Sequence, residues 1–274
     1  MEPEINLQAT LECGQVFHWR EREDGAWEGL IGGAHTVVRE KAGRLAILRG
    51  EPGTVARYFA LDHDLGGIYA AFPRDATMLA ALDFCRGLRI IRQPAWECLA
   101  TFITSSMKQV THIRQMSHAL RARFGHAVRG TRLRSYPSPA ALAAASEEEL
   151  RGCGLGYRAK NLRATAQRVA SGEADLEAWR QLDDGALREA LCTLPGVGRK
   201  VANCAMLFGF GRCGAFPVDT WIARIMREHY WRGRAKPTPL AIERLLSRRF
   251  GPHAGYAQQY LFHHARMTQR RARR

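Results

Sequence analysis

The stretch Leu-Pro-Gly-Val-Gly-Arg-Lys at residues 194–200 decides the fold of this chain. A proline and two glycines so close together predict a tight hairpin between two helices, because glycine reaches backbone conformations closed to other residues. Backbone N–H groups left free by the hairpin and by the start of the second helix can hold a phosphate. Lys200 lies in the first turn of that second helix, so we expect its amine beside bound nucleic acid.

A carboxylate follows downstream, in the sequence Phe-Pro-Val-Asp at residues 216–219. A neutral amine can attack the anomeric carbon of a nucleotide, and a carboxylate stabilises the positive charge that develops there as the base leaves. The product is a Schiff base, which opens a route to strand cleavage by β-elimination. The pattern predicts Lys200 as the nucleophile and Asp219 as its carboxylate partner.

The hairpin by itself is open to a second interpretation. A Pro-Gly-x-Gly turn also occurs in DNA-binding modules without catalytic activity, where the lysine only contacts phosphate. The sequence Pro-Val-Asp at residues 217–219 favours catalysis, and the non-catalytic DNA-binding protein stays as an alternative.

The charge of the chain agrees with a nucleic-acid partner. The 274 residues include 41 Lys+Arg and 26 Asp+Glu, which gives a formal net charge of +15 and suits a polyanion. Only five of the basic residues are lysines, so a lysine at position 200 is less easily explained by composition. The lysines are Lys41, Lys108, Lys160, Lys200 and Lys236.

Other bulk features concern the compartment. Seven cysteines at irregular spacing argue against a disulfide framework and suit a reducing environment. The N-terminus lacks an apolar targeting segment, and no stretch reaches transmembrane length. We expect a soluble intracellular protein, in the cytoplasm or nucleoid, with no membrane partner.

The chain divides into two kinds of hydrophobic pattern. Between Gly14 and Gly50, short apolar runs alternate with the turn signals Asp24-Gly25 and Gly32-Gly33, which predicts an antiparallel meander. From Pro94 onward the spacing becomes helical, with start signals at Ser138-Pro139 and in the pair Ser146 and Glu149.

These patterns predict an α+β fold. We expect a small N-terminal antiparallel β/α domain over residues 1–90. A larger all-helical domain should follow over residues 91–274, with the hairpin at residues 194–198.

Several stretches then resemble one family in particular, in the same order and nearly end to end. They are CGQVFHW at 13–19, Arg92-Gln93 with Glu97-Cys98, GLGYRA at 154–159, residues 194–204, and GPHAGYAQ at 251–258. The chain resembles the 8-oxoguanine DNA glycosylase branch of the helix-hairpin-helix (HhH-GPD) superfamily. The resemblance implies a bifunctional DNA glycosylase and abasic-site lyase of base excision repair, acting on duplex DNA that contains oxidised guanine.

The resemblance also implies roles for individual residues. Lys200 would form the Schiff base and Asp219 would be its partner. Phe262 and Cys204 would sandwich the flipped base, while Gln258 would bond its Watson–Crick edge. The backbone carbonyl of Gly14 would accept a hydrogen bond from N7–H, which the oxidised base carries and guanine lacks.

A second group of residues would meet the rest of the duplex. Tyr157 would wedge into the stack that the flipped base leaves, and Arg158 would bond the widowed cytosine. Gly196 and Gly198 of the hairpin would lie against phosphate. Stacking on an aromatic ring returns about 1–3 kcal/mol per base, which offsets much of the cost of flipping.

The chain departs from the family pattern at other positions. Met107 stands where the family has an asparagine that reads the cytosine opposite the lesion, and His112 replaces a second arginine at that base. Trp221 stands where the family has a histidine near the phosphate, and Ala265 replaces an aspartate. Because Met107 can fill space but cannot form amide hydrogen bonds, we predict a relaxed opposite-base preference.

The chemistry that the resemblance implies needs no cofactor, and the chain lacks the four closely spaced C-terminal cysteines of iron–sulfur glycosylases. We therefore expect no metal, and a monomer. Within the same superfamily, an alkylpurine DNA glycosylase is an alternative, although these enzymes usually lack the lysine that the chain has at position 200.

Overall fold

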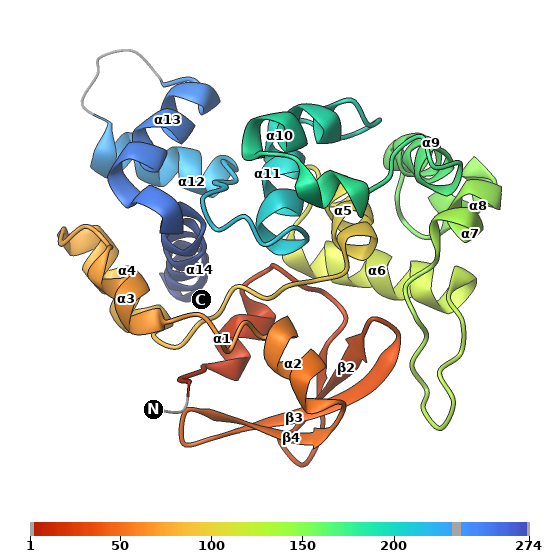
Figure 1. The fold of residues 1–274 in the computed structure, drawn as a ribbon, viewed down its shortest axis with the longest axis horizontal. Coiled ribbons are helices and arrows are strands. Elements are labelled where there is room, and N and C mark those ends of the chain that lie inside the picture. The colour runs from red at the N-terminus through yellow and green to blue at the C-terminus, as the bar shows by residue number, and fades with distance from the viewer. Residues whose placement is uncertain (1–2, 232–236, 273–274) are drawn as a thin grey trace.

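The computed structural model describes residues 3–231 and 237–272 and has the predicted α+β fold. A small antiparallel sheet lies at one end of the molecule and helices form the rest (Figure 1). The strands are β1 (Arg20–Glu21), β2 (Trp27–Ile31), β3 (Ala34–Lys41) and β4 (Arg44–Arg49), paired in chain order as a meander.

The predicted turn signals of the sheet are confirmed. Gly32 and Gly33 join β2 to β3 and both have a positive φ, as a tight two-residue turn requires. The apolar run at residues 16–19 was expected to belong to the meander but precedes β1 without strand structure. Its Trp19 packs instead on Gly29 of β2, where an added Cβ would come within 2.5 Å of the indole ring. Glycine therefore makes room for the tryptophan.

The N-terminal region also contains four helices, which the sequence patterns did not separate. They are α1 (Leu7–Glu12), α2 (Pro52–Tyr58), α3 (Leu65–Ala70) and α4 (Ala76–Cys85). Apolar side chains of α1 and α2 share a core with the sheet, but those of α3 and α4 lie in the larger helical core. The division at residues 90 and 91 stays a prediction.

The helical region begins as its start signals predict. The helices are α5 (Ala95–Thr104), α6 (Val110–Phe124), α7 (Pro139–Ala144), α8 (Glu147–Gly152) and α9 (Arg158–Ala170). Ser138 caps α7, and Ser146 with Glu149 forms the capping box of α8. Pro94 is the N-cap of α5, so the helix itself begins at Ala95.

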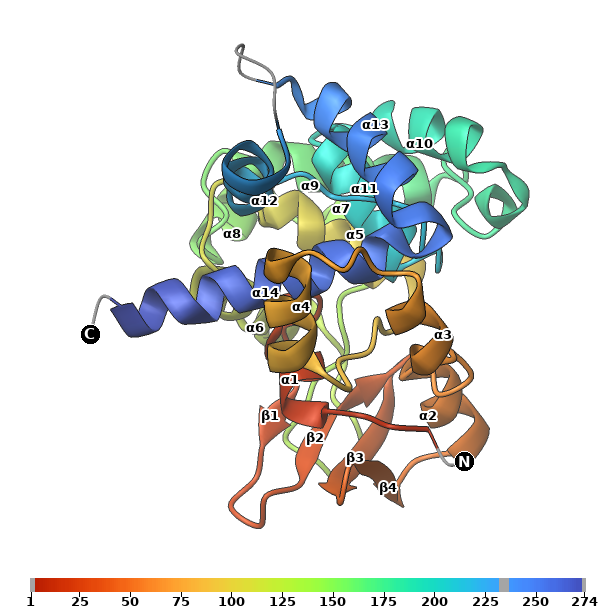
Figure 2. The same cartoon turned by 90° about the vertical axis from the view of Figure 1, so that its left-hand side faces the viewer.

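The C-terminal half carries the hairpin and the longest helix. It contains η1 (Ala178–Gln181), α10 (Asp184–Cys192), α11 (Arg199–Phe208), α12 (Thr220–Ile225), the π-helix η2 (Met226–Tyr230), α13 (Pro239–Phe250), η3 (Gly251–His253) and α14 (Ala254–Ala272). The far end of α14 extends away from the rest of the molecule (Figure 2). Its first turns pack against α11, since an added Cβ at Gly255 would meet Leu207 at 2.3 Å.

Candidate active site and DNA-facing surface

The hairpin between α10 and α11 is held against α9. Gly196 has a φ of +79°, and an added Cβ would come within 2.8 Å of the Asn161 side chain. The hydroxyl of Thr165 donates a hydrogen bond to the Pro195 carbonyl at 2.9 Å. Because of these two contacts, glycine is needed at position 196 and the hairpin has one fixed orientation on α9.

Gly198 is the N-cap of α11 and presents no side chain to the first turn of that helix. An added Cβ at Gly198 would meet nothing within 4 Å, so the space in front of the turn is open. A helix start with this exposure attracts anions, because its N–H groups and its dipole both favour negative charge. The start of α11 therefore has the geometry that phosphate binding requires.

Lys200 lies in this first turn and is half-buried. Its Nζ donates a hydrogen bond to Oγ of Ser105 at 3.3 Å and lies 5.2 Å from the centre of the Phe102 ring. Ser105 ends α5, and its own hydroxyl donates to the Phe102 carbonyl at 2.7 Å. The amine is thus held at the end of α5 by Ser105, a residue for which no role was predicted.

Asp219 is the N-cap of α12, and its Oδ1 accepts a hydrogen bond from the Ile222 N–H at 2.8 Å. Burial raises the pKa of this carboxyl group, while the Ile222 hydrogen bond and the charge of Lys200 act in the opposite direction. The capping bond fixes the direction of the carboxylate, and the electrostatic interaction places it within range of the lysine.

Cys204 lies one turn after Lys200 and is buried. Burial raises the pKa of its thiol, the charge of Lys200 lowers it, and the charge of Asp219 raises it. The thiol therefore senses both charges. The structure brings Lys200, Asp219 and Cys204 to one place, although they come from two different helices.

Asn203 explains how those two helices are joined. Its side chain is buried, and its Nδ2 donates to the Phe216 carbonyl at 3.1 Å, just before Asp219. Its Oδ1 accepts from Nε of Arg188 on α10 at 2.9 Å. Asn203 therefore ties α10, α11 and the approach to α12 together. Nothing in the sequence pattern distinguished it from other polar residues on a helix.

A second cluster surrounds Gly14. This residue has a φ of +89°, and an added Cβ would lie 3.2 Å from Val110 and 3.4 Å from the Phe262 ring. The structure therefore brings Gly14 and Phe262 together, as the residue roles require. A larger residue at position 14 would be strained and would also crowd the ring.

Two glutamines fix the backbone around Gly14, and neither was predicted to do so. Gln15 is fully buried, donates to the Arg89 carbonyl at 2.7 Å and accepts from the Ile91 N–H at 3.0 Å. Gln259 on α14 donates to the Cys13 carbonyl at 2.9 Å. The peptide beside Gly14 is thus anchored both to residues 89–91 and to α14.

Gln258 differs from its neighbour. It is 4% exposed, and among the described residues no donor reaches its Oε1. A buried acceptor without a partner costs about 1–3 kcal/mol in a folded protein, so proteins rarely keep one without a function. An acceptor for a ligand N–H is the kind of group that this site needs.

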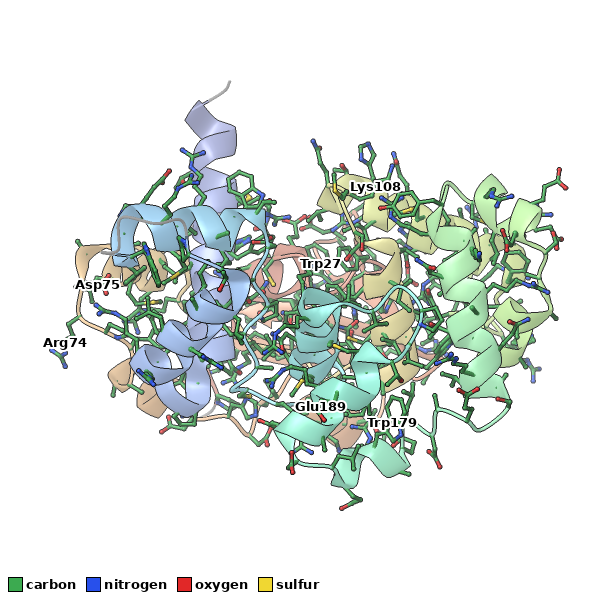
Figure 3. All side chains as sticks on the ribbon, turned by 90° about the horizontal axis from the view of Figure 1, so that it is seen from above. Trp27, Arg74, Asp75, Lys108, Trp179 and Glu189 are labelled. Atoms are coloured by element: carbon green, nitrogen blue, oxygen red, sulfur yellow. The ribbon has the colours of Figure 1, made fainter. Side chains whose placement is uncertain are left out.

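The remaining predicted residues lie on the surface or just below it. Met107 is 92% exposed with a φ of +55°, and Tyr157 is 64% exposed. Lys108, next to Met107, lies at the edge of the molecule opposite Trp179 and Glu189 (Figure 3). Arg158 is buried; its guanidinium lies 4.3 Å from the centre of the Tyr157 ring and donates to the carbonyls of Ser106 and Leu155.

The last two predicted residues lie on α6 and α12. His112 is exposed on α6. Trp221 is partly exposed in the first turn of α12, where its backbone N–H donates to Asp219. The backbone of Trp221 is therefore next to the Asp219 carboxylate.

Over residues 3–231 and 237–272, no cluster of three or more His, Cys, Asp or Glu side chains is arranged to hold a metal ion. Within the same ranges, no helix combines the length and apolar character needed to cross a membrane.

The chain matches two family models that together cover most of its length. Residues 1–99 match the 8-oxoguanine DNA glycosylase N-terminal domain, and residues 100–252 match the HhH-GPD superfamily base excision DNA repair protein. A curated relative is the "Probable N-glycosylase/DNA lyase" of Methanothermobacter thermautotrophicus, which is 32% identical over 97% of this chain and 95% of that protein.

Solved structures show the same similarity. MBOgg1 in complex with a low-affinity DNA ligand superimposes with a TM-score of 0.92 and 32% identity, covering 98% of this chain and 94% of that one. The Clostridium acetobutylicum 8-oxoguanine glycosylase/lyase, in complex with double-stranded DNA containing cytosine opposite 8-oxoguanine, gives a TM-score of 0.91 and 30% identity. That match covers 97% of this chain and 93% of the other.

Proposed function

This chain belongs to the 8-oxoguanine DNA glycosylase family, and from that premise we propose that it excises 8-oxoguanine from duplex DNA and cleaves the resulting abasic site. One observation carries the proposal: Lys200 is held in the first turn of α11 by its hydrogen bond to Ser105, and the Asp219 carboxylate, fixed as the N-cap of α12, lies within electrostatic range of it. An amine and a carboxylate therefore meet at the open start of α11, where DNA phosphate has a place to bind.

The reaction begins when the damaged nucleotide is flipped out of the duplex. The neutral amine of Lys200 attacks C1′; the nitrogen–carbon bond forms as the glycosidic bond breaks, and the departing base takes the bonding electron pair. Proton loss and opening of the sugar ring give a Schiff base. Removal of a C2′ proton then expels the 3′ phosphate and cleaves the strand.

Asp219 acts on this step through its charge. C1′ becomes cationic as the base leaves, and a fixed carboxylate stabilises that charge more than it stabilises the neutral substrate. The Ile222 capping bond holds the carboxylate in place before the substrate arrives. No part of this chemistry requires a metal or another cofactor.

Lesion recognition falls to the residues around Gly14. The Gly14 carbonyl accepts a hydrogen bond from N7–H of 8-oxoguanine, which repels guanine because guanine has an acceptor at N7. Gln258 bonds the Watson–Crick edge of the flipped base, and its unpartnered Oε1 supports this role. Phe262 and Cys204 enclose the two faces of the base.

The surface residues hold the rest of the duplex. Gly196 and Gly198 let the hairpin approach the phosphate backbone, and Trp221 lies beside it. Tyr157 enters the vacated stack, Met107 and His112 face the opposite strand, and Arg158 keeps a limited interaction with cytosine. The proposal includes a relaxed opposite-base preference, because Met107 provides no polar readout.

Two alternatives make different predictions. An alkylpurine glycosylase would not need the amine that Lys200 supplies, and a DNA-binding module would not need Asp219 or the acceptor of Gln258.

We propose a monomeric enzyme that acts on chromosomal DNA in the cytoplasm or nucleoid.

The test is a labelled duplex with one 8-oxoguanine, incubated with the purified protein and resolved for strand cleavage. The wild-type chain should release the base and cleave the strand at the lesion. A duplex carrying 3-methyladenine and an undamaged duplex should stay intact. An alkylpurine glycosylase without the amine would leave an uncut abasic strand, so each duplex is also treated with alkali, which cleaves at abasic sites. Base release from neither damaged duplex would leave only the DNA-binding module, and release from the alkylated one alone would favour the alkylpurine enzyme.

A further inference from the structure

The segment Ser105-Ser106-Met107-Lys108 forms a turn whose third residue has an unfavourable conformation. The Lys108 N–H donates to the Ser105 carbonyl at 3.2 Å, which closes the turn, and Met107 occupies its third position with a φ of +55°. Turns with a positive φ at that position favour glycine or asparagine. A methionine there needs support from outside the turn, because its side chain crowds its own backbone.

Arg158 contacts the peptide group whose orientation decides the type of this turn. Type I and type II turns differ by a flip of the peptide between the second and third residues, and that peptide carries the Ser106 carbonyl. Nε of Arg158 donates to this carbonyl at 2.9 Å, and Nη2 donates to it as well. A flipped peptide would lose both bonds and leave a buried guanidinium without them.

The same guanidinium also reaches the second exposed side chain of this face. It lies 4.3 Å from the centre of the Tyr157 ring, and Nη1 donates to the Leu155 carbonyl at 3.2 Å. Arg158 therefore lies between the two large exposed side chains, Met107 at 92% and Tyr157 at 64% exposure. Three of its five N–H groups are engaged with backbone carbonyls.

The turn also contacts the nucleophile. Ser105, the first residue of the turn, accepts the hydrogen bond from Nζ of Lys200 at 3.3 Å. A contact that fixes the turn therefore affects the position of Met107 near one end and the position of the Lys200 amine at the other.

We propose that Arg158 is a positioning residue: by clamping the Ser106 carbonyl it holds Met107 in the left-handed conformation, which projects this side chain beside Tyr157 as a second apolar wedge. The inference rests on the proposed function but gives Arg158 a task that does not depend on the opposite base. Met107 then enters the space opposite the lesion by filling it, without reading the base. Arg158 acts mainly by holding the backbone that carries Met107.

The test is a double-mutant cycle between Arg158→Met and Met107→Asn. Asparagine adopts the left-handed conformation more readily than methionine, so it needs the clamp less. The intrinsic cost of that conformation corresponds to a factor of about 5 to 30 in an equilibrium. We expect Arg158→Met to weaken binding of a duplex with a tetrahydrofuran abasic-site analogue about tenfold, and only about twofold in the Met107→Asn background.

Excision provides the second readout and separates the clamp from base reading. Single-turnover rates at saturating enzyme should fall about tenfold in Arg158→Met with adenine, guanine or thymine opposite the lesion as well as with cytosine. A residue that only reads cytosine would lower the rate opposite cytosine alone and would show no coupling to position 107. That result, or unchanged binding and rates, would overturn the proposal.

Arg163→Met is the matched control, because Arg163 lies on the same helix and donates to the Ala145 carbonyl at 2.8 Å, outside the site. It should show no coupling to Met107→Asn. Thermal unfolding identifies any variant that fails to fold, and recovery of binding in the double variant cannot come from an unfolded chain. Because the analogue duplex binds without reacting, absence of base excision by the wild type would count against the proposed function and leave the coupling measurable.

Discussion

The lesion side and the opposite-strand side of this molecule differ in how firmly they are built before DNA arrives. The proposed lesion side consists of Gly14, Lys200, Cys204, Asp219, Gln258 and Phe262. Buried hydrogen bonds from Gln15, Asn203 and Gln259 fix the backbone around it. The opposite-strand side consists of Met107, His112, Tyr157 and Arg158, and three of these side chains are exposed.

The difference follows from what each side has to recognise. A single damaged base offers fixed hydrogen-bonding groups, and a preorganised pocket distinguishes it from guanine at a well-defined atom. Four bases can stand opposite the lesion, and an apolar side chain that fills space treats them alike. On the proposed assignment, preorganisation on one side and steric filling on the other predict an enzyme that is selective for the lesion and tolerant of its partner base.

Asp219→Asn should produce the largest loss on the lesion side. Asparagine caps a helix as well as aspartate does, so α12 and the free energy of unfolding should be preserved while the charge is lost. We expect the single-turnover excision rate to fall about a hundredfold to a thousandfold, the scale of one preorganised electrostatic contact.

Asp183→Asn is the matched control for that change, since Asp183 caps α10 in the same way, with its Oδ1 accepting from Ala186 N–H at 2.8 Å. Its excision rate should stay within about twofold of the wild type. Equal rates for the two variants would show that the charge of Asp219 has no part in catalysis.

Gln258→Met tests whether the unpartnered acceptor serves the lesion. The variant should excise 8-oxoguanine roughly tenfold to a hundredfold more slowly, because about 1–3 kcal/mol of base recognition is lost. Its free energy of unfolding should stay the same or rise, since a buried acceptor without a partner is removed.

The neighbouring substitution Gln259→Met should behave in the opposite way. It breaks the hydrogen bond to the Cys13 carbonyl and leaves that buried group unpaired, so urea unfolding should show a loss of about 1–3 kcal/mol. If both glutamine variants lost the same stability, the distinction between a recognition residue and an anchoring residue would fail.

His263 makes the free energy of unfolding of the chain depend on pH. Burial and the charge of Arg266 lower the pKa of His263 from 6.5 to about 4. Between these values the unfolded chain binds a proton that the folded chain does not, so stability is present above pH 6.5 and is lost as the pH falls.

Between pH 7 and pH 5 the expected loss from His263 is about 2 kcal/mol. His263→Gln should therefore flatten the dependence of the unfolding midpoint on pH over this range. Part of the slope should remain, because burial also lowers the pKa of His18 and of His63. An unaltered slope in the variant would contradict the assignment.

The identity of the opposite base should have the smallest effect on the excision rate. Excision of 8-oxoguanine opposite cytosine, adenine, guanine and thymine should differ by less than about tenfold in the wild type. Met107→Asn should raise the rate opposite cytosine relative to the other bases by about threefold to tenfold, because an amide restores polar readout. A strong cytosine preference in the wild type would remove the contrast between the two sides.

The elements predicted most accurately from the sequence are those marked by neighbouring residues. The caps at Ser138 and Ser146 and the glycine turn at residues 32–33 involve neighbours in the chain, and the structure confirms them. Helices α1 to α4 escaped notice because short helices contain too few periodic positions to stand out.

The candidate site was predicted through its motifs but not through its supports. Lys200 and Asp219 stand out because a lysine after a glycine hairpin and a distal aspartate have a chemical meaning together. Asn203, Gln15 and Ser105 act through partners far away in the chain, so no local pattern marks them. The clamp of Arg158 on Ser106 spans 52 positions and is of the same kind.

The central claim is that the amine of Lys200 becomes covalently bonded to the sugar of the damaged nucleotide. Borohydride reduction during turnover on a duplex with 8-oxoguanine tests it directly, because a reduced Schiff base is a permanent cross-link visible on a denaturing gel. We predict that the wild-type chain is trapped on the DNA and that Lys200→Gln, at equal DNA occupancy, is not. A wild-type chain that releases the base without any cross-link would contradict the account.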